Sequence, residues 1–288
     1  MQHLKIFIEL TRLNKPIGFM LLFWPCSWGL TYAYSVNQNL YIFIFYLILF
    51  FLGSVLMRSA GCIFNDIIDK DFDRKVARTK SRPIASGKIT LNHSLTYVLI
   101  LCLIAFFILI QFNWLTIILG MSSMILAFSY PFMKRITYWP QLFLGITFNW
   151  GIILGWTALN NNVTPEIILL YTSAIFWTLG YDTIYGAQDM SDDEIIGLKS
   201  TSIKFKKNLK LFVGGSYSLV ILLIIYNFKE NLNFNFFTFF LSLFCLSLLI
   251  QVIKINKFDS QNYLYLFKIN NFSGAFLFFA LLSESINL

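Results

Sequence analysis

Long apolar segments separated by short polar segments repeat along the whole chain. About 20 predominantly apolar residues can cross a bilayer as an α-helix, and the spacing predicts nine such spans. Helices satisfy their own backbone groups in lipid, and the alternating pattern of a membrane barrel is missing. We expect an all-α integral membrane protein, with one domain over residues 1–288 and nine transmembrane helices. The expected spans are Gly18 to Tyr34, Leu40 to Gly61, Leu91 to Gln111, Trp114 to Met133, Tyr138 to Leu159, Glu166 to Gly186, Leu211 to Phe228, Phe234 to Ile253, and Ile269 to Ser285.

The composition excludes an ordinary soluble domain. Hydrophobic residues make up 57% of the chain and charged residues 12%, whereas about 25% of a typical soluble domain is charged. The N-terminal segment is too polar for the apolar core of a signal peptide, so we expect no cleaved leader. The four cysteines have no paired spacing, and we interpret them as packing residues: Cys26, Cys62, Cys102 and Cys245.

The distribution of basic residues predicts the topology. The net charge is +8, but Lys and Arg are concentrated near the N-terminus and at residues 70–88, 134–135, 199–210 and 254–268. With nine spans, these segments lie on one side of the membrane, and only Lys229 lies on the other. The positive-inside rule then predicts that the N-terminus and the basic segments face the cytoplasm. We expect a bacterial inner (cytoplasmic) membrane and no nucleic-acid partner.

The acidic residues are few, and most of them lie in two clusters. In the first cluster, Asp66, Asp69 and Asp73 are three, four and seven residues apart, a spacing that places them on one face of a helix. In the second, Asp182, Asp189 and Asp193 are seven and four residues apart and form a similar stripe. Mg²⁺ uses one or two carboxylates and fills its other positions with water and phosphate oxygens. The two stripes therefore predict a site for Mg²⁺ and a diphosphate.

Basic residues beside these clusters could bind the diphosphate. Arg78 and Arg82 are one helical turn apart, and an Arg guanidinium can form two hydrogen bonds to phosphate oxygens. Lys134 and Arg135 follow the fourth span and would add positive charge from another helix. The alternative for the clusters is a solvated ion-pair surface, and the alternative for Lys134 and Arg135 is a role only in setting topology.

Arg58 is an unusual residue because it lies inside the second span. It precedes Asn65 by seven residues, so it shares a helix face with the first acidic cluster. An intramembrane arginine is costly and indicates a functional site; it could bind a carboxylate or a phosphate, or it could extend to the membrane interface. Aromatic rings near the clusters, including Tyr130 and Tyr185, could stabilise a cation.

These residues, in this order along nearly the whole chain, resemble the UbiA family of intramembrane prenyltransferases. The first motif of that family, Asn-Asp-x-x-Asp-x-x-x-Asp, is matched from Asn65 to Asp73, and the second, Asp-x-x-x-Asp, from Asp189 to Asp193. The segments LNKPIG (13–18), MRSAGC (57–62), YPFMKR (130–135) and GLKST (197–201) resemble the branch of the family that acts on hydroxybenzoate. Asn14 departs from that branch, in which many members have Asp.

The resemblance implies a fold, an activity and a set of roles. The implied fold has nine transmembrane helices around a central cavity, cytoplasmic loops that carry the Asp-rich motifs, and a lateral opening for a lipid tail. The implied activity is Mg²⁺-dependent transfer of a polyprenyl chain from polyprenyl diphosphate to the ring carbon ortho to the phenol of 4-hydroxybenzoate, in ubiquinone synthesis. Asp66, Asp69, Asp73, Asp182, Asp189 and Asp193 would be catalytic, with Asp69, Asp73, Asp189 and Asp193 as metal ligands. The diphosphate would contact Asn65, Arg78, Arg82, Lys134 and Lys199, and the acceptor would contact Arg58, Tyr130 and Arg135.

Two alternatives stay open. Another acceptor, such as haem, a menaquinone precursor or a different aromatic compound, would use the same motifs. A divalent-cation or phosphate transporter would also have intramembrane acidic residues. However, a transporter would usually place its site near the middle of the membrane, whereas these acidic residues lie at one face.

Overall fold

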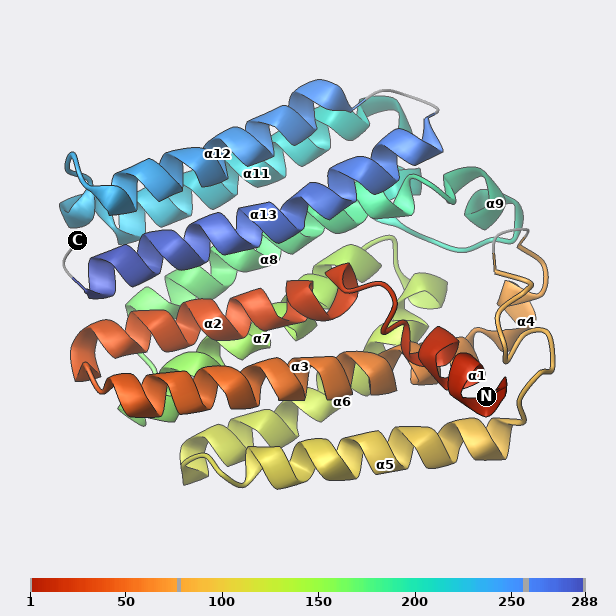
Figure 1. Cartoon of the computed structure of the whole chain (residues 1–288). Helices are drawn as coiled ribbons and strands as arrows, with labels where there is room; N and C mark the ends of the chain where they lie inside the picture. The colour runs from red at the N-terminus through yellow and green to blue at the C-terminus, as the bar shows by residue number, and fades with distance from the viewer. Residues whose placement is uncertain (1, 77–78, 256–258, 287–288) are drawn as a thin grey trace.

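The computed structural model describes residues 2–76, 79–255 and 259–286, and these residues form helices joined by loops, without strands (Figure 1). Among them, eight helices are long and apolar enough to cross a membrane. The prediction of an all-helical membrane protein is confirmed. The eight helices are α3 (Leu40–Ile68), α5 (Leu91–Leu109), α6 (Trp114–Ile136), α7 (Pro140–Asn160), α8 (Pro165–Gly186), α11 (Leu209–Asn227), α12 (Phe236–Lys254) and α13 (Ser260–Ser285).

The first expected span corresponds to α2 (Ile17–Asn37), which is 21 residues long but is not one of these eight. It contains Pro25, Ser27 and Gly29, and most of its second half is buried. A helix that packs mainly against other helices needs less lipid-facing apolar surface. The count of nine spans and the orientation of the chain stay predictions.

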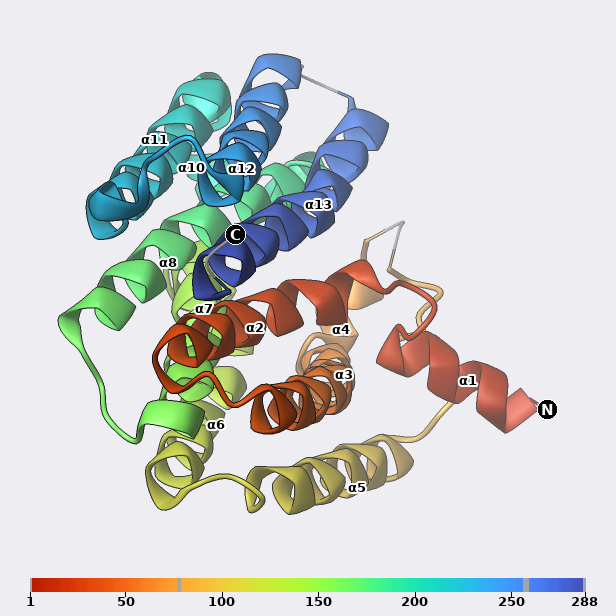
Figure 2. The same ribbon diagram turned by 60° about the vertical axis from the view of Figure 1, so that its left-hand side comes forward.

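The long helices lie side by side with similar axes (Figure 1). Helices α2 and α7 pack closely against each other in the middle of the bundle, α8 and α13 lie on one side of them, and α3 and α6 lie on the other. Helices α11 and α12 extend the first side, and α5 packs on α3. The short helices α1 (Gln2–Thr11), α4 (Lys70–Asp73) and α9 (Met190–Ile195) gather at one end of the bundle (Figure 1), and Figure 2 shows α1 and α4 from another side. We call this end the charged end and the opposite end the far end.

Glycines allow the close contact between α2 and α7. A Cβ on Gly29 would lie 2.0 Å from the Ile152 carbonyl oxygen, and a Cβ on Gly155 would lie 2.3 Å from the Cys26 carbonyl oxygen. Small residues at a helix interface let two backbones approach, which is how membrane helices gain packing energy. Cys26 is part of this interface, and all four cysteines are free.

Several helices extend beyond the expected apolar spans. Helix α3 continues to Ile68 instead of Gly61, and α6 continues to Ile136, so Lys134 and Arg135 lie in its last turn. Helix α13 begins at Ser260, nine residues before the expected Ile269, and Lys268 lies on the helix instead of in a loop. The expected ends were wrong because apolar length marks where lipid contact stops, whereas backbone hydrogen bonding continues into the polar interface.

Candidate functional site

A cavity of about 1740 Å³ opens at the charged end and extends between the helices. Ordinary small-molecule pockets measure about 300–1,000 Å³. Its inner part is lined by apolar side chains of α3, α5, α6 and α7, including Leu109, Met124 and Leu154. Leu99 and Leu103 also line it and are more than half exposed on the outer surface. The cavity therefore connects a charged opening with the apolar surface of the bundle.

The first acidic cluster forms one wall at the opening. Asp66 lies on the last turns of α3, Asp69 lies at its C-terminal cap, and Asp73 lies in α4. Helical bonding continues across the junction, since the Asp69 N–H donates to the Asn65 carbonyl (2.9 Å) and the Asp73 N–H donates to the Asp69 carbonyl (2.8 Å). All three aspartates are at most 7% exposed, and all three line the cavity. The spacing therefore brings them together as expected.

Basic side chains from distant segments pair with these aspartates. Arg82 Nη1 donates to Asp66 Oδ1 at 3.0 Å and to Asp73 Oδ2 at 2.8 Å. Lys134, from the end of α6, pairs with Asp69 Oδ2, which also accepts a hydrogen bond of 3.0 Å from Asn65 Nδ2. A buried carboxylate requires such partners. These residues belong to the predicted diphosphate group, whereas Arg78 lies outside the described residues.

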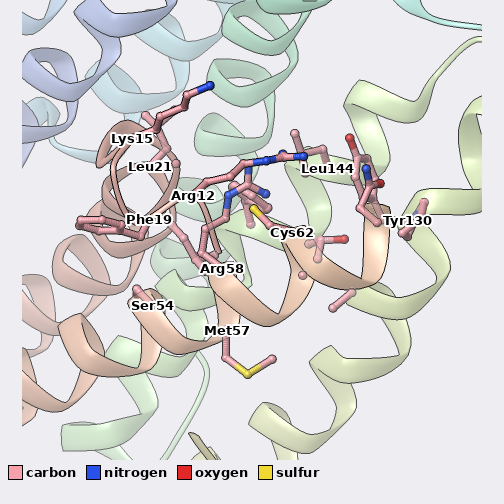
Figure 3. A pocket seen from close by; sticks show the side chains of 18 of the residues that line it. Arg12, Lys15, Phe19, Leu21, Ser54, Met57, Arg58, Cys62, Tyr130 and Leu144 are labelled. Atoms are coloured by element: carbon pink, nitrogen blue, oxygen red, sulfur yellow. The ribbon is translucent and has the colours of Figure 1, made fainter. Parts of the chain in front are cut away.

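Arg12 also contacts this wall, although the sequence reasoning assigned it no role at the site. Its Nη2 donates to Asp66 Oδ1 at 2.6 Å. Arg12 follows the end of α1 and has φ of 55°, a left-handed conformation that non-glycine residues adopt rarely. This backbone turn lets Arg12 line the cavity (Figure 3).

Burial and charge act in opposite directions on Asp73. Burial raises the pKa of the Asp73 carboxyl above its ordinary value, the charge of Arg82 lowers it, and the charge of Asp66 raises it further; the net direction is upward. A carboxylate under this pressure gains free energy from an additional cation. The wall is therefore suited to a metal ion.

The second acidic cluster also lines the cavity, but it comes from a different pair of helices, α8 and α9. Asp182 is on α8, Asp189 occupies the N-cap position of α9, and Asp193 is within α9. The stripe is interrupted by a turn after Gly186, yet all three aspartates line the cavity. Two acidic residues that lie next to the stripes in sequence are not part of this wall. Glu194, beside the second stripe, pairs with Lys206 at 2.6 Å, and Asp71, in the first cluster, has a side chain that is 84% exposed.

A ready-made metal cluster is not present in the described part of the chain. No three His, Cys, Asp or Glu side chains there lie close enough to hold an ion by themselves. Mg²⁺ needs only one or two carboxylates when phosphate oxygens and water supply the other ligands. The carboxylates of the two clusters, buried in the first and half-buried in the second, fit Mg²⁺ bound together with a phosphate group.

The predicted acceptor residues divide into two groups. Arg58 and Tyr130 line the cavity, and Figure 3 shows them on its walls together with Arg12 and Cys62. Arg58 Nε is buried with no hydrogen-bond partner among the described residues, and its guanidinium lies over the Phe148 ring at 5.3 Å. This position favours a role in the cavity over extension to the membrane interface.

Arg135 does not line the cavity. Its Nη2 donates to the Ile68 carbonyl at 2.8 Å, and its guanidinium lies 4.9 Å from the centre of the Phe72 ring. Successive helical residues point about 100° apart, so Lys134 faces the cavity and Arg135 faces outward. We interpret Arg135 as a clamp between α6 and the junction of α3 and α4, not as an acceptor ligand.

Lys199 lies at the edge of the cavity, in the loop after α9. Its N–H donates to the Lys134 carbonyl at 2.9 Å, and its Nζ donates to the Ile136 carbonyl at 3.2 Å. The loop is therefore attached to the end of α6, beside Asp69.

Proteins similar to this chain in sequence include two mitochondrial 4-hydroxybenzoate polyprenyltransferases. That of Arabidopsis thaliana is 48% identical over 73% of this chain and 51% of its own length. That of Homo sapiens is 46% identical over 74% of this chain and 57% of its own length. The alignment thus spans little more than half the length of these relatives.

Solved structures with the same fold include two UbiA homologs. The apo homolog from Aeropyrum pernix K1 has a TM-score of 0.72 and 22% identity, and the match covers 92% of this chain and 96% of that one. The homolog from Archaeoglobus fulgidus, solved with DMAPP and Mg²⁺, has a TM-score of 0.71 and 17% identity over 96% and 99% of the two chains. The model of the UbiA prenyltransferase family matches residues 22–272. Since this match covers most of the chain, the protein belongs to the UbiA prenyltransferase family.

Proposed function

We propose that this chain transfers a polyprenyl group from polyprenyl diphosphate to the ring carbon beside the phenol of 4-hydroxybenzoate, with Mg²⁺ as cofactor. One observation carries the proposal: two separate acidic stripes and their basic partners meet at one end of a large cavity that is otherwise apolar. A diphosphate needs the charged end, and a polyprenyl chain needs the apolar part. The names of the relatives support 4-hydroxybenzoate as the acceptor.

The diphosphate end has enough charge to hold a leaving diphosphate. Asp69, Asp73, Asp189 and Asp193 would hold Mg²⁺, which supplies charge neutralisation on the departing phosphate oxygens when it is bound. Arg12, Arg82, Lys134, Lys199 and Asn65 line the same opening and can donate to the remaining oxygens. Arg78 stays a predicted member of this group.

The reaction needs no covalent bond to the protein. The bond between the prenyl carbon and the phosphate oxygen breaks, and its electron pair leaves with the diphosphate. The ring carbon beside the phenol then forms a bond to the allylic cation, and the ring loses a proton to become aromatic again. Asp182 lines the cavity beside Tyr130 and Tyr185, and we assign it the role of proton acceptor. The apolar walls exclude water, which would otherwise trap the cation.

Arg58 is the residue that we assign to the acceptor carboxylate. Its buried Nε has no partner among the described residues, and a guanidinium can form two parallel hydrogen bonds to a carboxylate. Tyr130 would pack near the acceptor ring. An acceptor without a carboxylate would leave the Arg58 Nε unpaired, so this position favours an acceptor that carries a carboxylate.

The membrane in which the chain works is also a proposal. The basic charged end and the positive-inside rule support an active site that faces the cytoplasm of a bacterium. The two relatives named above are mitochondrial. Fractionation of the source cells, with a protease-accessible tag at the N-terminus, distinguishes the bacterial cytoplasmic membrane from a mitochondrial one and reports the orientation.

A direct assay tests the activity. Purified protein in detergent or liposomes is incubated with Mg²⁺, polyprenyl diphosphates of several lengths and either 4-hydroxybenzoate or a rival acceptor, and products are identified by mass spectrometry. We expect a prenylated hydroxybenzoic acid that is lost when Mg²⁺ is chelated. If only a rival acceptor is prenylated, that compound replaces 4-hydroxybenzoate as the assigned acceptor. Phosphate or cation flux into liposomes without any prenylation would overturn the proposal.

A further inference from the structure

A short segment after the second acidic cluster is bonded to three different helices. The Lys199 N–H donates to the Lys134 carbonyl of α6 (2.9 Å), and the Thr201 N–H donates to Gln141 Oε1 of α7 (2.9 Å). The Ser202 hydroxyl donates to the Thr183 carbonyl of α8 (2.8 Å). We call the group Gln141, Thr183, Thr201 and Ser202 the loop anchor.

The loop anchor is buried, and its hydrogen bonds form an ordered chain. Thr183, Thr201 and Ser202 are 0% exposed, and Gln141 is 5% exposed. The Thr183 hydroxyl donates to the Leu179 carbonyl at 2.6 Å, which uses its single proton. The Thr201 hydroxyl, 2.6 Å away, must therefore donate to the Thr183 oxygen. Polar groups buried this deeply depend on each of these bonds.

The loop anchor lies between the two acidic clusters. Thr183 follows Asp182 directly on α8. On the other side, the Leu198 N–H donates to the Asp193 carbonyl at 2.9 Å, and Lys199 is bonded to Lys134, the partner of Asp69. A continuous path of backbone and hydrogen bonds thus joins Asp193, the loop and Asp69.

One glycine permits this arrangement. A Cβ on Gly186 would lie 2.7 Å from the Ser202 hydroxyl oxygen and 3.3 Å from Gln141 Nε2. The end of α8, just before the turn that leads to Asp189, therefore packs directly on the loop anchor. Thr183, Thr201 and Ser202 do not line the cavity, so they cannot contact a ligand there.

We propose that the loop anchor is a positioning element that holds Asp189, Asp193 and Lys199 in register with Asp69 and Lys134, so that both acidic clusters bind one Mg²⁺-diphosphate unit. The inference rests on the proposed function, since it concerns how that site is assembled. Thr201 is the first residue of the short helix α10 (Thr201–Lys204), which follows the loop; its N–H bonds to α7 and its hydroxyl bonds to α8.

The test compares Thr201→Val with Thr201→Ser. Valine keeps the shape of threonine and removes the hydroxyl, whereas serine keeps the hydroxyl. Binding of Mg²⁺ with inorganic pyrophosphate is measured by calorimetry on the full chain in detergent. Supporting groups around a metal site typically contribute about 10-fold to 100-fold in affinity, so we expect Thr201→Val to bind about 10-fold more weakly and Thr201→Ser to bind within about 3-fold of the wild type. Ser202→Ala, which removes the bond to Thr183, should weaken binding in the same direction and serves as the variant if Thr201→Val does not fold.

A control at the far end separates positioning from general stability. Thr157 and Thr116 form a hydroxyl pair at 3.0 Å, and both are 0% exposed. Neither residue lines the cavity. Thr157→Val should lower the unfolding midpoint as much as Thr201→Val but leave pyrophosphate affinity unchanged.

Two results would overturn the inference: wild-type affinity in both Thr201→Val and Ser202→Ala, or an equal loss of affinity in Thr157→Val. Failure of the proposed function has a different signature. In that case the wild type itself shows no Mg²⁺-dependent pyrophosphate binding.

Discussion

The two ends of the helix bundle carry different polar residues. Each end must satisfy helix termini at a membrane surface. At the far end, neutral side chains do this: Asn113 Nδ2 donates to the Thr157 carbonyl at 2.6 Å, and Asn37 Nδ2 donates to the Leu159 carbonyl at 3.2 Å. At the charged end, Asp66, Asp69 and Asp73 are buried and paired with cations.

This difference indicates that the buried aspartates at the charged end have a role other than helix capping. Amides and hydroxyls are sufficient to cap helices in this fold, so capping does not require buried carboxylates. Moving paired charges out of water costs desolvation free energy, and packing alone does not offset this cost. The charged end carries this cost where the cavity opens, which supports a charged ligand there. The following changes test the contrast between the two ends, from the largest expected effect to the smallest.

Removing one carboxylate from either acidic cluster should have the largest effect. Asp69→Asn and Asp189→Asn each lose a charge that would hold Mg²⁺ and the leaving diphosphate, and loss of one such electrostatic group typically lowers kcat by about 100-fold to 1,000-fold. Initial rates in liposomes with saturating substrates measure the effect. The matched control is Asp71→Asn, since the Asp71 side chain is 84% exposed. Equal rates in Asp69→Asn and Asp71→Asn would show that the buried aspartate contributes no more to catalysis than the exposed one.

Replacing Arg58 should affect one substrate more than the other. Arg58→Ala removes a guanidinium whose Nε is buried at the cavity wall, and a hydrogen bond to a charged group contributes about 1.5–3 kcal/mol. We expect KM for 4-hydroxybenzoate to rise about 10-fold to 100-fold, with little change for the prenyl donor. Steady-state kinetics with each substrate varied in turn measure the split. A rise of equal size for both substrates would assign Arg58 to the diphosphate.

At the far end, a change should affect stability and not catalysis. Asn113 caps α6 by accepting from the Thr116 N–H at 3.0 Å, and it also donates to α7. Loss of an N-cap side chain costs about 0.5–2 kcal/mol, so Asn113→Ala should lower the unfolding midpoint in detergent and leave KM for both substrates unchanged. A changed KM would mean that the far end contributes to the site.

Arg135 should give the smallest effect of the four. It is partly exposed, and its Asp69 contact is 3.4 Å long; exposed ion pairs contribute about 0.2–1 kcal/mol. Arg135→Ala should lower stability by about that amount, whereas Lys134→Ala, on the cavity side, should also lower activity. A large increase of the acceptor KM in Arg135→Ala would restore the acceptor role expected from the sequence.

Residue spacing was sufficient to predict some parts of the molecule. The positions of Asp66, Asp69 and Asp73 follow from a helix that continues past the apolar span, because helical periodicity is a local property. The outward position of Arg135 was not predicted, although the same periodicity implies it once Lys134 is known to face the cavity. The early start of α13 could not be seen in an apolar pattern, because Lys268 and its polar neighbours interrupt it.

Other parts depend on contacts between segments that are far apart in the sequence. Arg12 reaches Asp66 only because its backbone adopts φ of 55° and α1 packs on α3. The bond between Thr201 and Gln141 joins residues 60 positions apart. Local periodicity contains no signal for either contact, because both require the helices to be assembled first.

The central claim is that both acidic clusters bind one diphosphate through Mg²⁺, and a double-mutant cycle tests it most directly. Binding of Mg²⁺ with inorganic pyrophosphate is measured by calorimetry for the wild type, Asp69→Asn, Asp189→Asn and the double variant. Residues that share a ligand network show coupling of about 0.5–3 kcal/mol. We predict that the double variant loses less binding free energy than the sum of the two single variants, by an amount in this range. Losses that add to within about 0.5 kcal/mol, or wild-type binding in either single variant, would contradict a shared site.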